Sequence, residues 1–566
     1  MPALLTSLAL LLAGASAQAP NTTQGGAPCD SDWDCSLGGT CANSACVCDV
    51  WWTGASCALL NLAPADPAAS GLVAPGYFSW GGHPLQAADG EYHLLASFLC
   101  DHATLGSWTT KSSIAHATAA APEGPYTFAP GVDSQLVVPP WSHGASVTRD
   151  PATGEFLLFH IGNGRVAPST WSPCYNPAED EPAYATAALA AAAAPRAPLP
   201  GAGEGDTTFV ERAPTLAGPW TSFNNNSGLD VIYPAGSWAT SMTNPAAFIF
   251  PNGTTLLYYR ADQCPKTWGA LAPACIGVAI ADSWQGPYTS LFDQPITHPE
   301  GEDPAVFRDP RGNFHMLTNV NTYHARCAAG VPCGGHAWSR DGLAWSNQTV
   351  GAFGPVVRWT NGSYLYGAYA ERPQVLQAAD GTPISFHTGF GQASYADSHN
   401  FAQLFCTPGR ADCGPTHPPA APTVSFALRG ACLTTNASFP CAGGHADSCP
   451  LALGACGDPM AAWTLLGSGT LGNAKLPGSV TNVDCDACAA GSVLKVTSDA
   501  QYDDGVAFDA AAGELRSLKC PGFCLSGMTA KRNPPCEGGE WTAPAQVALV
   551  ACGTADAGGW TSTPVA

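Results

Sequence analysis

Four sites next to a proline carry side chains that can exchange protons or hold a polar ligand. They are Glu302 with Asp303, Glu371 with Arg372, His83, and Asn244. Carboxyl and imidazole groups act as general acids and bases, and an arginine can hold a substrate or lower the pKa of a nearby carboxyl. A residue before proline is pushed toward extended backbone, so these sites predict strand starts.

The same pattern follows each site: an apolar run, a glycine turn and an aromatic-rich run. It begins at Pro84, Pro245, Pro304 and Pro373, and a less regular copy spans 143–162. Turns of the form Gly-Pro-aromatic at Gly124, Gly218 and Gly286 close three of the units. Five sheet-forming units at roughly sixty- to hundred-residue spacing indicate radial repetition of blades. The predicted fold class is therefore all-β, with a five-bladed β-propeller over residues 76–407.

The innermost strands of a propeller line its central channel, so residues that open these strands should converge on one axis. We expect Asn244 and Arg372 to bind substrate there, together with His143, His336 and Asp262. Side chains of neighbours on a strand point to opposite faces. Only one of Glu302 and Asp303 is therefore expected to reach the channel.

The strings EDPAVF, RGNFH, GGHAWSRDGLAW and ERPQVL resemble the propellers of glycoside hydrolase family 43 over about 76–405. This resemblance implies inverting hydrolysis by a general base, a general acid and a carboxylate that tunes the acid. The family's base and tuning positions correspond to His83 and Asn244, and its acid to Glu302. The catalytic candidates are thus Glu302, Asp303, Glu371 and His83.

Structural interpretations remain open for several of these residues. A capped turn would explain Arg372, and hydrogen-bonded structural histidines would explain His83, His143 and His336. The strings 308–310 and 149–151 (Arg-Asp-Pro) resemble a motif of sucrose-cleaving enzymes, but both precede glycine turns. They are predicted to be hairpin tips.

The six cysteines between residues 29 and 57 resemble those of an EGF-like module. Spacing alone allows fifteen connectivities; the resemblance implies Cys29 with Cys41, Cys35 with Cys46, and Cys48 with Cys57. A module this short needs its disulfides, because it cannot bury a sufficient core. Its acidic residues fit a solvated surface better than a calcium site, and no metal or cofactor is expected.

Residues 423–566 resemble the ricin-type β-trefoil lectins. Two repeats start with Cys-Leu and end in Trp463 and Trp560, which we expect in the core. The family's sugar-orienting Asp is replaced by Thr434 and Ser526, and the Gln before tryptophan by Ala461 and Gly558. Sugar binding by this region is therefore left open.

Composition points to an extracellular protein of 566 residues with 24 cysteines and a net charge of −22. Residues 1–17 resemble a signal peptide, and the cysteine content fits an oxidising compartment. The negative charge disfavours nucleic acid and anionic membranes, and no later run has the length of a membrane span. Linkers are expected at 18–28, 58–75 and 408–422, and a low-complexity insertion at 168–205. N-glycosylation sequons occur at Asn21, Asn225, Asn252, Asn347, Asn361 and Asn436.

The leading hypothesis is a secreted glycosidase-like protein that acts on a cell-wall or extracellular polysaccharide. The alternative is a non-catalytic protein on the same propeller that binds polysaccharide or glycoprotein glycans or mediates adhesion. A matrix protein that uses its flanking modules for protein contacts is a third class. Two carboxylates that face one pocket would favour the enzyme.

Overall fold

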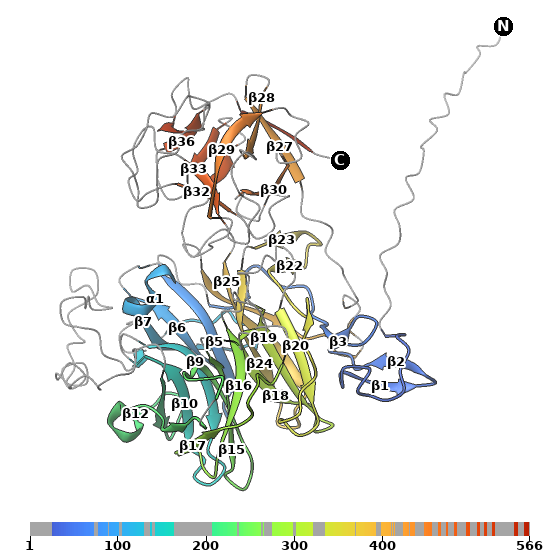
Figure 1. Ribbon diagram of the computed structural model, residues 1–566, viewed down its shortest axis with the longest axis vertical. Helices are drawn as coiled ribbons and strands as arrows, with labels where there is room; N and C mark the ends of the chain where they lie inside the picture. Colours follow the sequence, from blue (N-terminus) through green and yellow to red (C-terminus); the bar gives the residue numbers. More distant parts are fainter. Residues whose placement is uncertain are drawn as a thin grey trace.

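The computed structural model describes residues 25–408 with gaps, residues 410 and 413, and the strands of the region after 422 (Figure 1). The gaps are 73–76, 89, 101–102, 104, 129–135, 139–141, 163–206, 235–236, 262–263, 265–273, 298–300, 321–333, 368 and 392–397. The signal peptide, the low-complexity insertion and the 408–422 linker predicted from the sequence therefore lie wholly or almost wholly outside the described residues. No helix in the described part is long and apolar enough to span a membrane.

Antiparallel sheets form the body of the molecule, one to each blade. Blade 1 contains β5 (Phe78–Gln86), β6 (Tyr92–Leu99), β7 (Ser112–Ala119) and β8 (Leu136–Val138). Blade 2 contains β9 (His143–Arg149), β10 (Phe156–Ile161), β11 (Thr208–Ala213) and β12 (Thr221–Ser222). Blade 3 contains β14 (Thr243–Ile249), β15 (Thr255–Ala261), β16 (Cys275–Ala281) and β17 (Tyr288–Ser290), with β13 (Val231–Ile232) parallel to β17.

Blade 4 contains β18 (Glu302–Arg308), β19 (Phe314–Asn319), β20 (Gly334–Ser339) and β21 (Thr349–Val350). Blade 5 contains β24 (Tyr369–Gln377), β25 (Pro383–Gly391) and β26 (His399–Leu404). The first strands β5, β9, β14, β18 and β24 each contact the next, and β24 contacts β5, which closes a ring of five. The five-bladed propeller predicted from the sequence repeats is confirmed.

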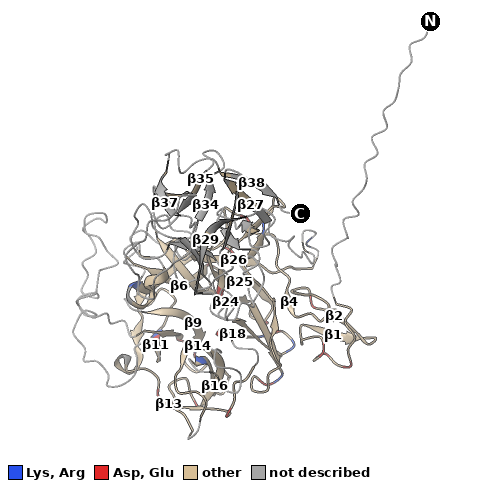
Figure 2. Ribbon diagram, turned by 45° about the horizontal axis from the view of Figure 1, so that its top comes forward, with Lys and Arg blue, Asp and Glu red and all other residues tan. Residues whose placement is uncertain are grey.

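The short elements lie in the connections. The helix α1 (Trp108–Lys111) follows η1 (Leu105–Ser107) between β6 and β7, η3 (Phe223–Asn226) follows β12, and β22 (Val356–Arg358) pairs with β23 (Tyr364–Tyr366) ahead of blade 5. Charged residues are sparse along the ribbon (Figure 2). Clusters of buried apolar residues span neighbouring blades, such as the one that joins Leu95 of β6 to Ala145 of β9.

A β-bulge occurs at the same place in the innermost strand of every blade. Residues 81–82, 144–145, 244–245, 303–304 and 372–373 each stand opposite a single residue of the second strand. The first residue of each bulge has a φ between 50° and 69°. The extended backbone predicted for Asn244, Asp303 and Arg372 is therefore wrong, because the bulge requires the left-handed conformation there.

The predicted linker before the propeller is part of the sheet structure. Leu62 bridges Phe405 and Leu72 bridges Asn400, so the segment runs along the outer edge of β26. The amide of Ala63 also donates to Leu404 O at 2.9 Å. Blade 5 thus has three strands of its own, and an earlier part of the chain covers its edge.

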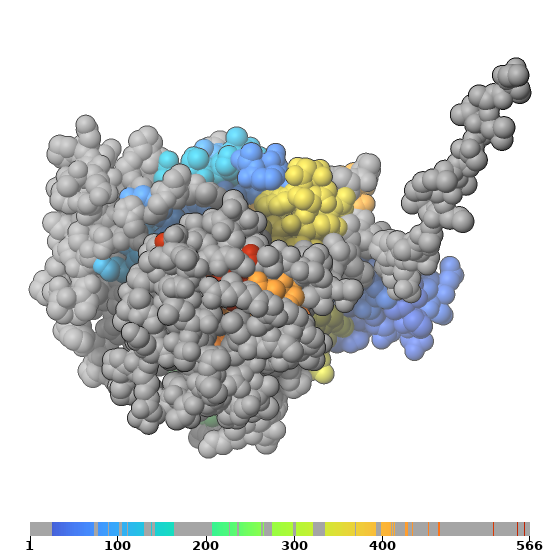
Figure 3. All heavy atoms as spheres, turned by 90° about the horizontal axis from the view of Figure 1, so that it is seen from above, coloured from blue at the N-terminus to red at the C-terminus, as the bar shows by residue number. Residues whose placement is uncertain are grey.

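The N-terminal module, residues 25–57, has β1 (Gly39–Ala42), β2 (Ala45–Cys48) and β3 (Trp52–Thr53), which pairs with β4 (Leu59–Leu60). Its disulfides join Cys29 to Cys41, Cys35 to Cys46 and Cys48 to Cys57. It lies at the rim of the propeller beside blade 4, and seen from above it forms one edge of the molecule (Figures 1 and 3).

The C-terminal module is also built of strands. They are β27 (Thr423–Leu428), β28 (Ala431–Thr435), β29 (Asp447–Gly454), β30 (Trp463–Leu465), β31 (Leu471–Asn473), β32 (Val480–Val483), β33 (Leu494–Thr497), β34 (Val506–Asp509), β35 (Glu514–Ser517), β36 (Phe523–Ser526), β37 (Ala548–Ala551) and β38 (Trp560–Pro564). Trp463 and Trp560 are buried, as expected, and each indole N–H donates to the leucine carbonyl of its own Cys-Leu pair. Neither ring is available to stack on a sugar.

Candidate functional site

The bulges place five equivalent residues around the propeller axis, one from each blade. The residue just before each bulge is Trp80, His143, Thr243, Glu302 or Glu371, and each pairs with the same position of its second strand. We call these five residues the pre-bulge ring. Its two carboxyls come from neighbouring blades, so sequence-distant glutamates are brought to one level of the axis.

The first bulge residues form a second set at the axis, the bulge ring. It consists of Gly81, Gly144, Asn244, Asp303 and Arg372. Asn244 Nδ2 donates to Asp303 Oδ1 at 2.6 Å, and Arg372 Nη1 lies 3.2 Å from the same oxygen. The Thr243 hydroxyl donates to Asn244 Oδ1 at 3.0 Å, which fixes the orientation of the amide. The buried Asp303 is thus held by two other blades.

Arg372 explains why two of the bulge residues are glycines. A Cβ on Gly81 would lie 2.8 Å from the Arg372 Cβ, and one on Gly144 would lie 2.5 Å from its Nη1. The arginine side chain therefore extends over blades 1 and 2 through space that only glycine leaves open. Its own positive φ is unfavourable for a bulky residue, and its ion pair with Asp303 favours this arrangement.

The glutamates of the pre-bulge ring have different surroundings. Glu302 pairs with Arg260 at 3.4 Å and accepts from Asn319 Nδ2 at 3.1 Å. Burial, together with the charges of Glu302 and Asp303, raises the pKa of Glu371 well above its usual value. Glu371 therefore has a strong tendency to stay protonated, whereas the Glu302 carboxyl is paired with Arg260.

The pKa of Asp303 is also shifted. Burial raises it to about 6, although the nearby charge of Arg372 opposes this shift. The charge of Glu302 contributes to the raised pKa of Asp303 as well. That only one of these neighbours reaches the channel stays a prediction.

The bulge ring surrounds a small pocket. Its lining includes Gly82, Ala145, Pro245, Pro304 and Gln374 beside the bulge residues themselves. Its cavity volume is about 20 Å³, which is room for roughly one water molecule. A cavity of this size is too small for a sugar ring.

Two predicted histidines lie elsewhere than expected. His83 follows the bulge of blade 1 by one residue, and Gly81 holds the position equivalent to Asn244. Its Nδ1 is buried, and burial lowers its pKa to about 4. His336 is on the third strand of blade 4, stacked on Trp52 of the N-terminal module. It belongs to that interface and not to the axis.

His143 does reach the axis, as a member of the pre-bulge ring. The Ser112 hydroxyl is 2.7 Å from its Nδ1, and the Trp108 ring lies 5.3 Å away. Burial, followed by the charge of Arg372, holds its pKa well below the usual value. It is therefore a neutral histidine near neutral pH.

Asp262, the remaining substrate-binding candidate, lies outside the described residues. Within the described part, Cys29, Cys35 and Cys46 form the group of potential metal ligands, but their sulfurs are engaged in disulfides. Disulfides also join Cys264 to Cys275 and Cys406 to Cys413.

Sequence reasoning missed Arg260, Asn319 and Thr243. Arg260 and Asn319 end or nearly end second strands, opposite the pre-bulge residues of blades 3 and 4. The repeat itself carried the signal that could have found them. Aligning second strands as well as first strands would place each of them opposite a pre-bulge residue, Arg260 opposite Thr243 and Asn319 opposite Glu302.

Comparison with known proteins finds no matching protein-family model and no matching curated protein. Among solved structures, the exo-β-1,3-galactanase 1,3Gal43A from Clostridium thermocellum is 12% identical, with a TM-score of 0.35 over 89% of this chain and 98% of that one. The family 117 glycoside hydrolase Zg3597 from Zobellia galactanivorans is 14% identical, with a TM-score of 0.36 over 61% and 89%. The GH43_1 enzyme from Xanthomonas citri in complex with xylotriose is 13% identical, with a TM-score of 0.35 over 59% and 89%. At these values the likeness says nothing about activity.

Proposed function

We propose that the propeller is a glycoside hydrolase of the inverting type. The observation that carries this proposal is the pair of glutamates at equivalent positions of adjacent blades, Glu302 beside a guanidinium and Glu371 with a raised pKa. A carboxyl that keeps its proton and a second carboxyl paired with a cation can serve as acid and base at one pH. Inverting hydrolysis needs this division of roles.

In the proposed reaction, Glu371 donates its proton to the oxygen of the leaving group. The Glu302 carboxylate takes a proton from the water that attacks the anomeric carbon from the opposite face. From the bulge ring, the charge of Asp303 raises the pKa of Glu371 and that of Arg372 lowers it. The family resemblance implies that Glu302 is the acid; here Glu302 is proposed as the base, and Glu371 is the acid because its surroundings favour protonation.

We further propose that the protein is secreted, that the N-terminal module is EGF-like and that the C-terminal module is a β-trefoil. The disulfide pairs of the first and the repeated tryptophan–leucine bond of the second support these assignments. The substrate would be an extracellular or cell-wall polysaccharide. The low overall charge density of the chain fits a neutral glycan.

A second candidate is glycan binding without hydrolysis. It is favoured by Asp303, whose Oδ1 is already engaged by Asn244 and Arg372. It is also favoured by the narrow cavity inside the bulge ring. Both observations fit a rigid, inactive axis.

The test is a screen of secreted protein against aryl glycosides and extracellular polysaccharides, with binding measured in parallel. The variants Glu302→Gln and Glu371→Gln should each lower turnover by about 10²- to 10⁴-fold, the usual contribution of a general acid or base. Glu155→Gln, on the hairpin side of blade 2, should leave turnover unchanged. Binding without turnover in the parent protein would reject hydrolysis and support the second candidate.

A further inference from the structure

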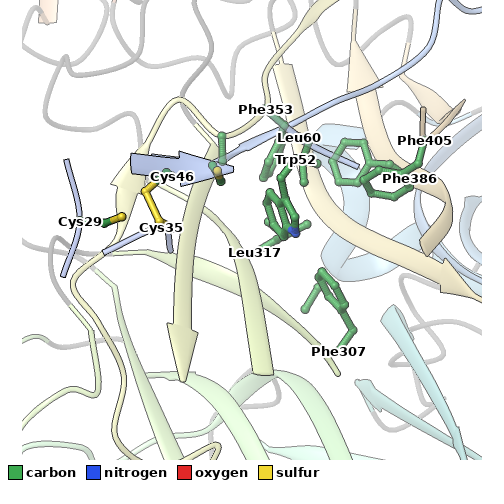
Figure 4. Close-up of a cluster of buried hydrophobic side chains, with 13 residues drawn as sticks. Cys29, Cys35, Cys46, Trp52, Leu60, Phe307, Leu317, Phe353, Phe386 and Phe405 are labelled. Carbon is green, nitrogen blue, oxygen red and sulfur yellow. A yellow bond between two sulfur atoms is a disulfide. The ribbon is translucent and has the colours of Figure 1, made fainter. Parts of the chain in front are cut away.

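The N-terminal module is seated in the seam between blades 4 and 5. Its Trp52 is 1% exposed and lies in one apolar cluster with Phe307 and Leu317 of blade 4 and Phe386 of blade 5 (Figure 4). Leu60, just beyond the module, joins the same cluster and donates its amide to Ala352 O at 2.9 Å. The module is therefore packed into the propeller, and not merely tethered to it.

The Arg-Asp-Pro turn of blade 4 supplies the polar part of this contact. Arg311 donates to Gly39 O at 2.9 Å, to Asp49 Oδ2 at 2.7 Å and to Leu37 O. The turn is thus a hairpin tip, as predicted, and it also binds the N-terminal module.

Two buried histidines lie under Trp52 and form a chain of hydrogen bonds. His336 stacks on the indole with ring centroids 4.2 Å apart, and its Nδ1 is 3.1 Å from Ala58 O. Its Nε2 is 3.0 Å from His315 Nδ1, and His315 Nε2 is 3.5 Å from Asp309 Oδ2. The chain thus begins at the module's end and finishes at the Arg-Asp-Pro turn.

When both histidine rings are neutral, the hydrogen-bonded chain can accept only one more proton. The Ala58 carbonyl can only accept, so Nδ1 of His336 carries a hydrogen and its Nε2 accepts from His315. One further proton on His315 Nε2 would face Asp309. A second would set N–H against N–H at the 3.0 Å contact and would require the rings to separate.

Burial, and not the nearby charges, is the main obstacle to further protonation of the pair. In the described part of the chain, the charged groups near the pair are Asp309 and Arg311 of the turn; Asp49 of the module pairs with Arg311, and the charge of Asp32 acts on Asp49. Burial lowers the pKa of both histidines, and the neighbouring His315 lowers that of His336 further. Asp309 opposes this shift for His315 alone.

We propose that this histidine pair is an acid-sensitive latch that holds the N-terminal module in the seam between blades 4 and 5. Undocking exposes both rings to water, where they take up protons that the docked chain cannot hold. Docking is therefore at full strength above the ordinary histidine pKa of about 6.5 and weakens as the pH falls below it. Each such proton weakens docking by up to about tenfold per pH unit.

Release of the N-terminal module would affect Glu302 and Asp303 through β18. This strand starts with Glu302 and Asp303 and contributes Ala305 and Phe307 to the cluster around Trp52. Loss of the module would remove the packing behind the strand that carries both carboxyls. The latch would thus couple acidity to the order of that strand.

Blade 1 offers a matched control for the latch. His93 and His116 occupy the register positions equivalent to His315 and His336, and their nitrogens are 2.8 Å apart. Their rings are stacked with centroids 5.0 Å apart. This pair faces the seam between blades 1 and 2, away from the N-terminal module, so it shares the chemistry of the latch without its location.

The experiment is hydrogen–deuterium exchange on the full chain from pH 7.5 to 4.5, corrected for the intrinsic exchange rate. Protection of peptides covering residues 45–60 should fall below pH 6.5, by up to about tenfold per proton at pH 5.5. His315→Gln with His336→Gln should remove this pH dependence, and His93→Gln with His116→Gln should retain it. Constant protection in the parent protein, or equal pH dependence in both double variants, would overturn the proposal.

Should the His315 and His336 double variant not fold, Trp52→Phe serves in its place. A smaller cover over the rings admits water, so the docked rings can take up protons before release, and the fall in protection per pH unit below 6.5 should be smaller than in the parent. A fall as steep as that of the parent would overturn the latch.

Discussion

At the residue scale, the bulge ring shows how one backbone position takes different side chains for different tasks. Glycine at 81 and 144 leaves space, and Asn244 and Asp303 tolerate the left-handed conformation because short polar side chains can. Arg372 adopts it at a cost of about 1–3 kcal/mol. The ion pair with Asp303 holds the arginine there.

Replacing Arg372 with glycine tests that ion pair, because glycine keeps the backbone conformation. The change leaves a buried carboxylate short of its cation, so we expect stability to fall by about 3 kcal/mol at pH 7. Without the cation the pKa of Asp303 rises further, so the loss should shrink as the pH falls and the carboxyl takes up a proton. Denaturant unfolding at pH 7 and pH 5 measures both effects.

Arg212→Ala is the control for this change. Arg212 lies 3.9 Å from Glu155 at the surface, where an ion pair contributes about 0–1 kcal/mol. If Arg372→Gly lowers stability no more than Arg212→Ala does, the ion pair between Arg372 and Asp303 does not stabilise the bulge ring.

The two proposed catalytic roles predict different responses to the leaving group. A substrate with a good leaving group needs no proton donor, so Glu371→Gln should keep most of its activity on a dinitrophenyl glycoside and lose it on a polysaccharide. Glu302→Gln should lose activity on both, because water activation is needed in each case. If Glu302→Gln kept its activity on the dinitrophenyl glycoside and Glu371→Gln lost it, Glu302 would be the acid and Glu371 the base.

The pH profile follows from the same assignment. Glu371 must be protonated to act, so activity should fall as the pH rises through its raised pKa. This fall should disappear from the residual activity of Glu371→Gln.

At the element scale, the bulge of β9 depends on the arginine from blade 5. Gly144→Ala introduces a methyl group 2.5 Å from Arg372 Nη1 at a φ of 69°. Gly154→Ala, at the β9–β10 turn, has a φ of 77° but no heavy atom within 4 Å of the new Cβ. We expect about 1 kcal/mol of destabilisation at 154 from backbone strain alone, and clearly more at 144.

The difference between the two alanine variants measures the contact with Arg372. In an Arg372→Gly background it should vanish, since the crowding atom is gone. A difference that persists in that background would assign the sensitivity of Gly144 to strand geometry and not to the arginine.

At the scale of the whole molecule, the N-terminal module and the propeller should unfold together. Replacing Cys48 and Cys57 with serine removes one bridge, which in a small domain costs about 2–5 kcal/mol. Because Trp52 and Leu60 are part of the core between blades 4 and 5, calorimetry should show the propeller transition moving down with the module. A module transition that shifts alone, with the propeller unchanged, would contradict this coupling.

The sequence by itself determined the repeat, and with it the number of blades. Turn residues and alternating apolar runs act locally, so the patterns after Pro245, Pro304 and Pro373 could be recognised without a structure. The same holds for Trp463 and Trp560, whose place in a repeated motif predicted their burial. Glu302, Asp303 and Glu371 could be proposed for the axis because first strands line a propeller channel.

Only the tertiary structure decided what each residue at the axis does. Register is set by pairing between strands, so the two-residue offset between His83 and Gly81 was invisible in the Pro motif. The bulge put Asp303 in the left-handed conformation and brought it against Asn244 and Arg372 from two other blades. His336 was drawn to a different interface because a tryptophan more than 280 residues earlier packs against it. Such long-range packing depends on shape and burial, which no local pattern encodes.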